Sequence, residues 1–204
     1  MQKPVLRLLM SCLFLAPPAL GQAAEFPFFD GFEATSLSGH WTVSSPWGVG
    51  RAELTTAGAP HSGDRHLTLD ASSEGVDSNV VADLRVDLSK SSSVLLEFGV
   101  RDYGDEYGTS SDQWLGTGAH NYDGVFLSDD GGATWTEALA LDDAAAGGSY
   151  QKHTLDLDAL VAAAGMSYSS NFLIRFSWQG EYAIPGDGFA IDDIGLRALE
   201  YQDL

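Results

Sequence analysis

The sequence predicts an all-β fold, in which two antiparallel sheets pack as a β-sandwich with one short helix. Many short segments alternate apolar and polar residues with a period of two, as strands with one buried face do. The 204-residue chain contains 23 glycines, which are typical of frequent turns. Only residues 158–165 combine an acidic start with a glycine end, the pattern of a helix.

The first 24 residues have the pattern of a secretory signal peptide. Lys3 and Arg7 precede a short apolar run, and small residues follow up to Ala24. We expect cleavage near Ala23 or Ala24, so that residues 25–204 form a single secreted or periplasmic domain without membrane insertion. Cys12 weakly matches a lipoprotein site, but the apolar run continues past it, which favours the signal peptide.

The predicted strands follow in chain order and build one core. The alternation is clearest in 79–88, where Val80 and Leu84 share one face and Asp83 and Arg85 the other. Further strands are expected at 40–44, 50–55, 65–70, 94–101, 123–128, 134–141, 150–157 and 174–178. Each large apolar side chain buried on these faces contributes roughly 1.5–3 kcal/mol. The alternating faces therefore predict a hydrophobic core between the sheets.

Charge and cysteine content limit the function. The formal net charge is −19, which repels nucleic acid and anionic lipid. Cys12 is the only cysteine, so a mature chain without the leader forms no disulfide, and its stability must come from the core or a metal. The acidity indicates solubility, calcium binding or both.

Residues 186–196 place two adjacent carboxylates in an apolar strand that otherwise reads as buried. In one register Asp193 faces the core with Phe189 and Ile191, and in the other Asp192 does so with Ile194. Burying an unpaired charge costs several kcal/mol or more, on the order of magnitude. We therefore expect a metal ion here, a set of backbone amides or a local bulge.

Residues 102–122 form a long segment without periodicity between two strands. Such loops are often functional, since aromatic rings stack on sugars and carboxylates bind sugar hydroxyls or calcium. The candidate ligand-binding residues are Tyr103, Asp105, Glu106, Tyr107, Trp114 and Tyr122. The alternative is a loop whose aromatic side chains fix it to the sheet.

Residues 128–135 match the Asp-box pattern S-x-D-x-G-x-T-W at every fixed position. The matching residues are Ser128, Asp130, Gly132, Thr134 and Trp135. In such a hairpin the aspartate binds turn amides, glycine supplies a positive φ and the tryptophan packs beneath the turn. The motif predicts a structural hairpin rather than a catalytic site.

The order of FFDGFE at 28–33, HSGDRHLTLD at 61–70 and GFAIDDIGL at 188–196 resembles MAM-like, concanavalin-type jelly-roll domains of secreted bacterial proteins. The chain is also similar to reelin subrepeats, which carry an Asp-box. The resemblance implies a jelly-roll sandwich and a structural calcium ion. It implies Glu33 and Asp193 as leading calcium ligands, followed by Asp192, Asp30 and Asp70. The cysteine pairs of animal MAM domains are missing here.

The sequence favours a non-catalytic protein. It lacks a GxSxG elbow, an HExxH helix and a phosphate-binding glycine loop. A glycosidase needs only two carboxylates, for which Glu97 and Glu106 are the residues to test. We expect an exported, calcium-stabilised module for extracellular protein recognition or adhesion. The alternative is a carbohydrate-binding module that uses the 102–122 loop, so the expected partner is a protein or a glycan.

Overall fold

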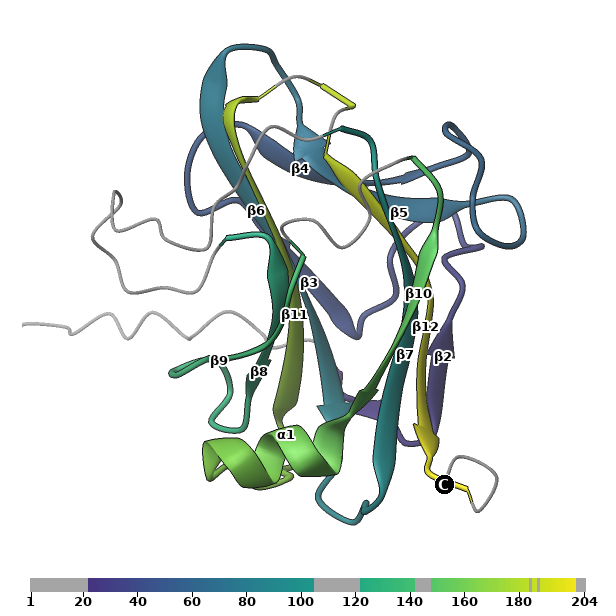
Figure 1. The fold of residues 1–204 in the computed structure, drawn as a ribbon, viewed down its shortest axis with the longest axis vertical. Helices are drawn as coiled ribbons and strands as arrows, with labels where there is room; N and C mark the ends of the chain where they lie inside the picture. The colour runs from purple at the N-terminus through teal and green to yellow at the C-terminus, as the bar shows by residue number, and fades with distance from the viewer. Residues whose placement is uncertain (1–21, 105–121, 142–147, 184, 187, 201–204) are drawn as a thin grey trace, which may run out of the picture.

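The computed structural model describes residues 22–104, 122–141, 148–183, 185–186 and 188–200 (Figure 1). One sheet contains, in pairing order, β1 (Ala24–Glu25), β6 (Val76–Asp87), β11 (Phe172–Ala183), β8 (Gly124–Ser128) and β9 (Thr136–Ala140), with β3 (Trp41–Ser44) also on β6. The other contains β10 (Gln151–Asp156), β7 (Val94–Asp102), β12 (Phe189–Ala198), β5 (His66–Ala71) and β4 (Gly50–Thr55), with β2 (Phe28–Asp30) also on β12. The predicted two-sheet β-sandwich is confirmed.

Strand pairing is antiparallel throughout the described residues except at the N-terminal end. There β1 runs parallel to β6, with Ala24 opposite Val86. Ala24 is buried in the core, although the sequence predicts a leader that ends at this residue. The short β1 and β2 were not expected from the alternation, because two or three residues are too few to show a period.

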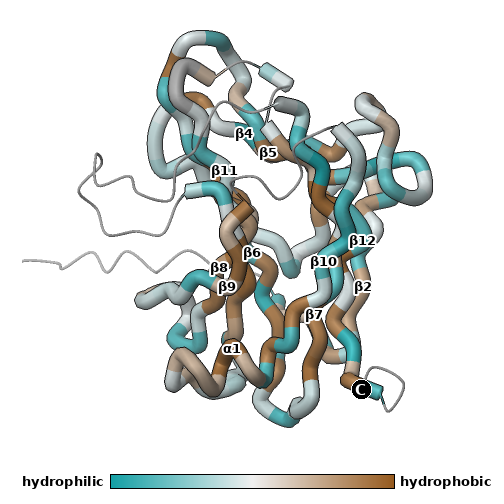
Figure 2. The backbone as a smooth tube through the Cα atoms, in the orientation of Figure 1, coloured by the Kyte–Doolittle hydropathy of each residue, from teal (hydrophilic) through white to brown (hydrophobic). Residues whose placement is uncertain are grey.

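The core lies between the two sheets and follows the predicted alternation. In β6 the side chains of Val80 and Leu84 are fully buried, and in β11 those of Phe176 and Trp178 are too. Figure 2 shows that hydrophobic residues concentrate along strands such as β6, β8 and β7. Outward positions of β6 and β11 carry polar side chains such as Asp83 and Arg175, whereas outward Phe126 of β8 is buried by other parts of the chain.

The one helix among the described residues closes one end of the sandwich (Figure 1). This helix, α1 (Leu157–Ala164), begins where Asp156 accepts a hydrogen bond from the Ala159 amide. It ends at Gly165, whose φ of 67° is the left-handed conformation that glycine adopts without strain. No helix among the described residues is long and apolar enough to cross a membrane.

A β-bulge in β12 resolves the problem of the two adjacent carboxylates. Asp192 lies opposite Gly99 and Gly195 opposite Glu97, so two residues of β12 face one residue of β7. Asp193 occupies the extra position with a φ of 52°. The inward pattern restarts after the bulge, which places both Ile191 and Ile194 in the core. Of the alternatives expected from the sequence, the local bulge is therefore present, and apolar residues of both registers face the core.

The hairpin between β8 and β9 is closed by the side chains of the Asp-box. Asp130 accepts hydrogen bonds from the amide and hydroxyl of Thr134 at 2.9 and 2.7 Å, and from the Ser128 hydroxyl at 2.8 Å. These donors hold the pKa of Asp130 well below its usual range. The Trp135 indole donates to the Gly132 carbonyl at 3.1 Å, where Gly132 has a φ of 95°. All of these bonds are internal to the turn.

Candidate functional site

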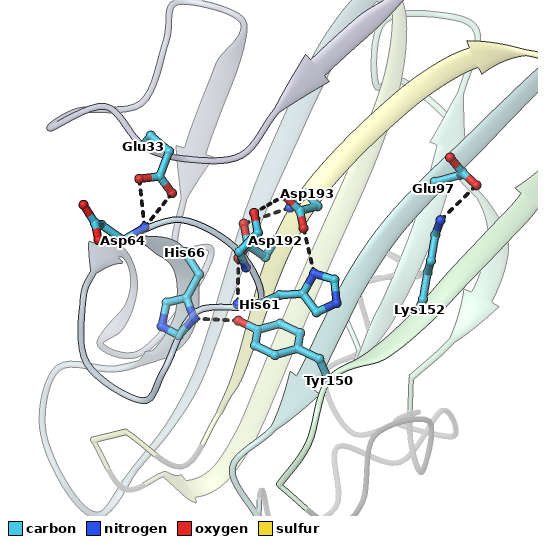
Figure 3. Close-up of polar contacts among 10 residues, drawn as sticks. Glu33, His61, Asp64, His66, Glu97, Tyr150, Lys152, Asp192 and Asp193 are labelled. Atoms are coloured by element: carbon cyan, nitrogen blue, oxygen red, sulfur yellow. Dashed lines mark hydrogen bonds and ion pairs between the residues drawn. The ribbon is translucent and has the colours of Figure 1, made fainter.

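The loop 56–65, between β4 and β5, lies over the outer face of the second sheet and is held there by carboxylates. Asp192 accepts hydrogen bonds from the backbone amides of His61 and Ser62 at 2.9 and 3.2 Å, and from its neighbour Asp193 at 2.8 Å (Figure 3). The Asp192 residue is 0% exposed. Backbone amides therefore supply the compensation that a buried carboxylate requires.

Asp193 and Glu33 fix the same loop at two further points. Asp193 binds the His61 imidazole Nδ1 at 2.6 Å and accepts from the Ser62 hydroxyl at 2.7 Å. Glu33 accepts from the Asp64 amide with both oxygens, at 2.9 and 3.1 Å, and from the Arg65 amide at 3.2 Å. A side chain on Gly63 would come within 2.1 Å of a Glu33 oxygen. Glycine at this position permits the close approach.

Burial governs the ionisation of Asp192. Desolvation raises the pKa of its carboxyl group, and the neighbouring negative charge of Asp193 raises it further. The hydrogen bonds from the amides of Ser62, Asp193 and His61 act in the opposite direction. The loop amides thus offset part of the cost of placing this charge inside the protein.

The predicted calcium ligands are divided among separate contacts. Asp30 accepts from the Phe32 amide and the Trp41 indole, each at 2.9 Å. Asp70 forms a bidentate ion pair with Arg51 at 2.7 and 2.9 Å. Glu33, Asp192 and Asp193 converge on the 61–65 loop, but their oxygens accept hydrogen bonds.

A calcium ion needs six to eight oxygens at about 2.3–2.6 Å. Within the described part of the chain, no group of three or more His, Cys, Asp or Glu side chains is placed to hold a metal ion. Calcium binding stays a prediction from the sequence.

Tyr103, one of the predicted ligand-binding residues, lies beneath the 56–65 loop. Its ring packs under the Arg101 guanidinium at 4.8 Å and against His66, while Arg101 donates to the Gly58 carbonyl. His66 in turn binds the Tyr150 hydroxyl at 2.5 Å. Burial raises the pKa of both tyrosines. Tyr103 therefore supports the loop, as in the alternative in which aromatic residues fix a loop to the sheet.

The other predicted ligand-binding residues are not brought together with Tyr103. Tyr122 lies beside the first sheet, where its hydroxyl donates to Glu137 and its ring meets Phe126 edge-on at 5.1 Å between centroids. Four of the predicted residues lie outside the described part of the chain, namely Asp105, Glu106, Tyr107 and Trp114. The two described ends of the 102–122 segment thus adjoin different sheets.

An exposed aromatic ring and a hollow lie together on the outer face of the second sheet. Phe28 packs against the core, whereas the next residue, Phe29, points outward and is 67% exposed. A hollow of about 300 Å³ lies beside this ring. It is lined by Phe29, His61, Glu97, Phe98, Gly99, Lys152, Asp193 and Gly195. A second hollow, of about 310 Å³, shares Phe29, Glu97 and Gly195 with the first and extends to Arg197.

Strand pairing explains why these residues meet. β12 lies between β7 and the short β2, and its Gly195 pairs with both Glu97 and Phe29. β10 pairs with β7 on the far side, which brings Lys152 opposite Gly99. Glycine at 99 and 195 allows neighbouring rings to approach the backbone: a Cβ at 99 would lie 3.3 Å from Tyr150 and 3.5 Å from His61, and one at 195 would lie 3.8 Å from Phe29. The Phe29 ring and the charged side chains therefore stand beside these two glycines.

Glu97 is held between two cations. Its carboxylate accepts from the Arg197 guanidinium at 3.0 and 3.3 Å. On its other side, Lys152 Nζ lies 3.3 Å away (Figure 3). Arg197, followed by Lys152, lowers the pKa of this carboxyl group. A general acid in glycoside hydrolysis needs the opposite shift, because it must hold a proton near neutral pH. The surroundings of Glu97 do not suit that role.

No protein-family model and no curated protein sequence matches the chain. Solved structures, however, do match the chain. One is the carbohydrate-binding module TmCBM61, solved in complex with β-1,4-galactotriose. Its superposition on this chain has a TM-score of 0.50 and 16% sequence identity, and it covers 83% of this chain and 94% of TmCBM61. The family 11 carbohydrate-binding module of the cellulosomal cellulase Lic26A-Cel5E of Clostridium thermocellum gives 0.50 at 12% identity over 87% and 97%. These likenesses show a shared β-sandwich fold.

Sequence reasoning missed most of the residues around the hollow. Phe29, His61, Lys152 and Arg197 were not predicted as site residues. One signal was present, because two consecutive phenylalanines in a strand must point to opposite faces. The cations had no such signal, since they come from strands that are distant in the sequence.

Proposed function

We propose that this protein is a non-catalytic carbohydrate-binding module that holds a glycan on the outer face of its second sheet. The observation that carries the proposal is the exposed Phe29 ring beside an open hollow with a polar rim. The apolar face of a sugar ring stacks on an aromatic side chain, and its hydroxyl groups bond to polar groups around it. Phe29 supplies the stacking surface, and the rim supplies donors and acceptors.

The fold supports this function over catalysis. Carbohydrate-binding modules are among the solved structures with the same sandwich, and one of them is bound to a galactotriose. The ionised state favoured at Glu97 also argues against a glycosidase, in which this residue was the acid to test. The sandwich serves as a rigid scaffold that presents the Phe29 face.

The apolar surface favours a glycan over a protein partner. The large hydrophobic residues exposed in the described part of the chain are Phe29, Val43 and Val76. Phe29 belongs to β2 of the second sheet, whereas Val43 and Val76 belong to β3 and β6 of the first. Protein interfaces bury about 800 Å² on each partner around an apolar centre. The protein-recognition role and the MAM-like family remain predictions from the sequence.

Isothermal titration calorimetry with a panel of neutral and acidic oligosaccharides tests the proposal. The panel includes β-1,4-galacto-oligosaccharides and mixed-linked gluco-oligosaccharides. Phe29→Ala is expected to weaken binding about tenfold, since aromatic contacts contribute about 0.5–1.5 kcal/mol beyond area burial. Phe29→Tyr keeps the ring and is expected to retain binding. Because the Phe29 side chain is exposed, the melting temperature of both variants should match the parent.

A matched variant separates this face from the 102–122 loop. Trp114→Ala is expected to bind glycans as the parent does. Loss of binding in Trp114→Ala with normal binding in Phe29→Ala would place the site on the loop instead. Failure of the parent protein to bind any oligosaccharide of the panel would overturn the proposed function.

A further inference from the structure

The His61 imidazole differs in its surroundings from two histidines of the second sheet, His66 and His153. His66 is 0% exposed and binds the Tyr150 hydroxyl, and His153 stacks on Phe98 with ring centroids 5.2 Å apart. His61, by contrast, lines the first hollow, and its side chain is 40% exposed. Its ring is therefore open to a ligand in the hollow.

Three contacts hold the His61 ring in place. Asp193 binds its Nδ1 at 2.6 Å, and the Tyr150 ring packs against it with centroids 5.1 Å apart. The backbone at Gly99 lies next to the ring, since a Cβ there would come within 3.5 Å of His61 Cγ. The orientation of the imidazole is thus set by the protein rather than by the ligand.

These contacts leave Nε2 of His61 available. Within the part of the chain that the structure describes, Nδ1 is the ring nitrogen that forms a hydrogen bond. Figure 3 shows the ring between Asp193 and Lys152, with its second nitrogen pointing away from Asp193. An ionised carboxylate only accepts hydrogen bonds, so Nδ1 carries a hydrogen and the neutral ring presents Nε2 as an acceptor.

The charges at the hollow favour an uncharged ligand. Lys152 is paired with Glu97, and Arg197 donates to Glu97 through Nε and Nη2 and to a backbone carbonyl through Nη1. Asp193 lines the same hollow, with Asp192 next to it in the chain. An anionic sugar would meet these carboxylates, whereas the hydroxyl groups of a neutral sugar both donate and accept.

We propose that His61 orients a neutral sugar at the Phe29 face, through a hydrogen bond between Nε2 and one sugar hydroxyl. This proposal rests on the proposed function and names the group that recognises its ligand. The sugar ring stacks on Phe29, and its hydroxyl meets His61 in the same hollow of about 300 Å³. Asp193 is a positioning residue, because it holds Nδ1. A hydroxyl group donates to the neutral ring and accepts from the protonated one, so it suits both states.

Calorimetry of His61→Asn tests the contact. The probe is the neutral oligosaccharide of the panel that binds most tightly, a β-1,4-galacto-oligosaccharide or a mixed-linked gluco-oligosaccharide. The asparagine amide takes the place of Nδ1 toward Asp193 and has no counterpart of Nε2. The affinity is therefore expected to fall about three- to tenfold, as the loss of one hydrogen bond predicts.

Ser62→Ala is the matched control. It removes the other side-chain bond of the loop to Asp193, at 2.7 Å, and Ser62 does not line the hollow. The affinity of this variant should match that of the parent. Equal losses in Ser62→Ala and His61→Asn would show that the loop as a whole, and not Nε2, governs binding, and would overturn the proposal.

Monodeoxy analogues of the same probe separate a direct contact from a structural role. In the parent, one analogue should bind about three- to tenfold more weakly than the probe, because it lacks the hydroxyl that meets Nε2. In His61→Asn, this analogue and the probe should bind alike, which is the coupling expected of two groups in contact. If every analogue loses as much affinity in His61→Asn as in the parent, the proposal is overturned.

Hydrogen–nitrogen correlation spectra of isotope-labelled histidine side chains observe the atom itself. On saturation with the probe, the Nε2 resonance of His61 should shift, while those of His66 and His153 stay in place. Binding without this shift would overturn the role of His61 but leave glycan binding intact. Tighter binding of an acidic oligosaccharide than of every neutral one would overturn the neutral ligand. Failure to bind any oligosaccharide would overturn the proposed function as well.

Discussion

Two groups of carboxylates on the same sheet face are satisfied in different ways. Asp192 and Glu33 accept hydrogen bonds from backbone amides of the 61–65 loop. Glu97 is paired instead with the side chains of Arg197 and Lys152, of which Figure 3 shows Lys152. The first arrangement fixes the backbone of the loop, and the second pairs side chains of three neighbouring strands, β10, β7 and β12.

This difference separates structure from recognition on one surface. The Asp192 carboxylate accepts three amide hydrogen bonds and is 0% exposed, so it presents no surface to a ligand. The Glu97 carboxylate lies between Lys152 and Arg197 and fixes the position of both side chains at the edge of the hollow. The contacts made by each acid therefore indicate its role better than its position in a motif does.

The largest effect should follow removal of the buried loop anchor. Asp192→Ala leaves three backbone amides without their acceptor, and each unsatisfied buried donor costs about 1–3 kcal/mol. We expect a loss of about 2–4 kcal/mol in the free energy of unfolding, measured by urea denaturation. Glu97→Gln, the matched change in the hollow, should cost less than about 1 kcal/mol. Equal losses in the two variants would contradict the distinction between the two regions.

A smaller effect is expected at the Asp-box hairpin. Asp130→Ala removes the acceptor of the Thr134 amide and of two hydroxyl groups, so the turn between β8 and β9 loses its internal bonds. The melting temperature should fall, because these bonds close the turn. Glycan affinity should stay unchanged, since the hairpin belongs to the other sheet. Reduced affinity in a folded Asp130→Ala protein would assign the hairpin a direct role in binding.

Asp192 and Glu97 should also contribute to the free energy of unfolding with pH dependences of opposite sign. Burial raises the pKa of Asp192 above its ordinary value of 3.8, so the folded protein binds this proton more tightly than the unfolded chain does. Its contribution to stability therefore rises as pH falls through the folded-state pKa. The cost of Asp192→Asn should accordingly increase toward acid pH.

Glu97 behaves in the opposite way. Arg197 lowers its pKa below the ordinary 4.5, so its contribution is present above that pH and is lost as pH falls through the folded-state pKa. The cost of Glu97→Gln should shrink over the same range. Urea denaturation of both variants and the parent between about pH 3 and pH 7 measures the two slopes. Slopes of the same sign would show that the two environments do not differ as described.

The smallest effect concerns calcium. Because the oxygens of Glu33 and Asp193 accept hydrogen bonds in the loop, we expect the melting temperature to be the same in chelator and in several millimolar calcium. Magnesium serves as the control ion. A calcium-specific rise that Asp193→Ala abolishes would establish the site predicted from the sequence. It would also show that these side chains leave the loop when the ion binds.

Periodicity predicted most of the fold, because long strands with one buried face carry a strong signal. Strands such as 94–101 and the helix at 158–165 lie within a few residues of β7 and α1. Periodicity failed at Asp192 and Asp193, where one extra residue resets the alternation. A bulge of this kind depends on the partner strand, which the local sequence does not identify.

The candidate site was harder to predict than the fold. Glu97, Lys152 and Arg197 meet only because β7 lies between β10 and β12. Their positions are distant in the chain, and each residue alone looks like an ordinary strand charge. The 102–122 segment attracted attention through its composition, but Tyr103 supports a loop and Tyr122 adjoins the other sheet. Amino-acid composition thus identified a segment rich in aromatic residues, but it did not indicate on which sheet each of their side chains lies.

Nuclear magnetic resonance titration of the labelled protein with an oligosaccharide that binds in calorimetry tests the central claim most directly. If the Phe29 face holds the glycan, the largest shifts in amide resonances will fall on Phe29, His61, Gly99, Lys152 and Gly195. Amides of the Asp-box hairpin should stay in place and serve as an internal reference. Shifts confined to residues 102–122, with those around Phe29 unchanged, would contradict the account.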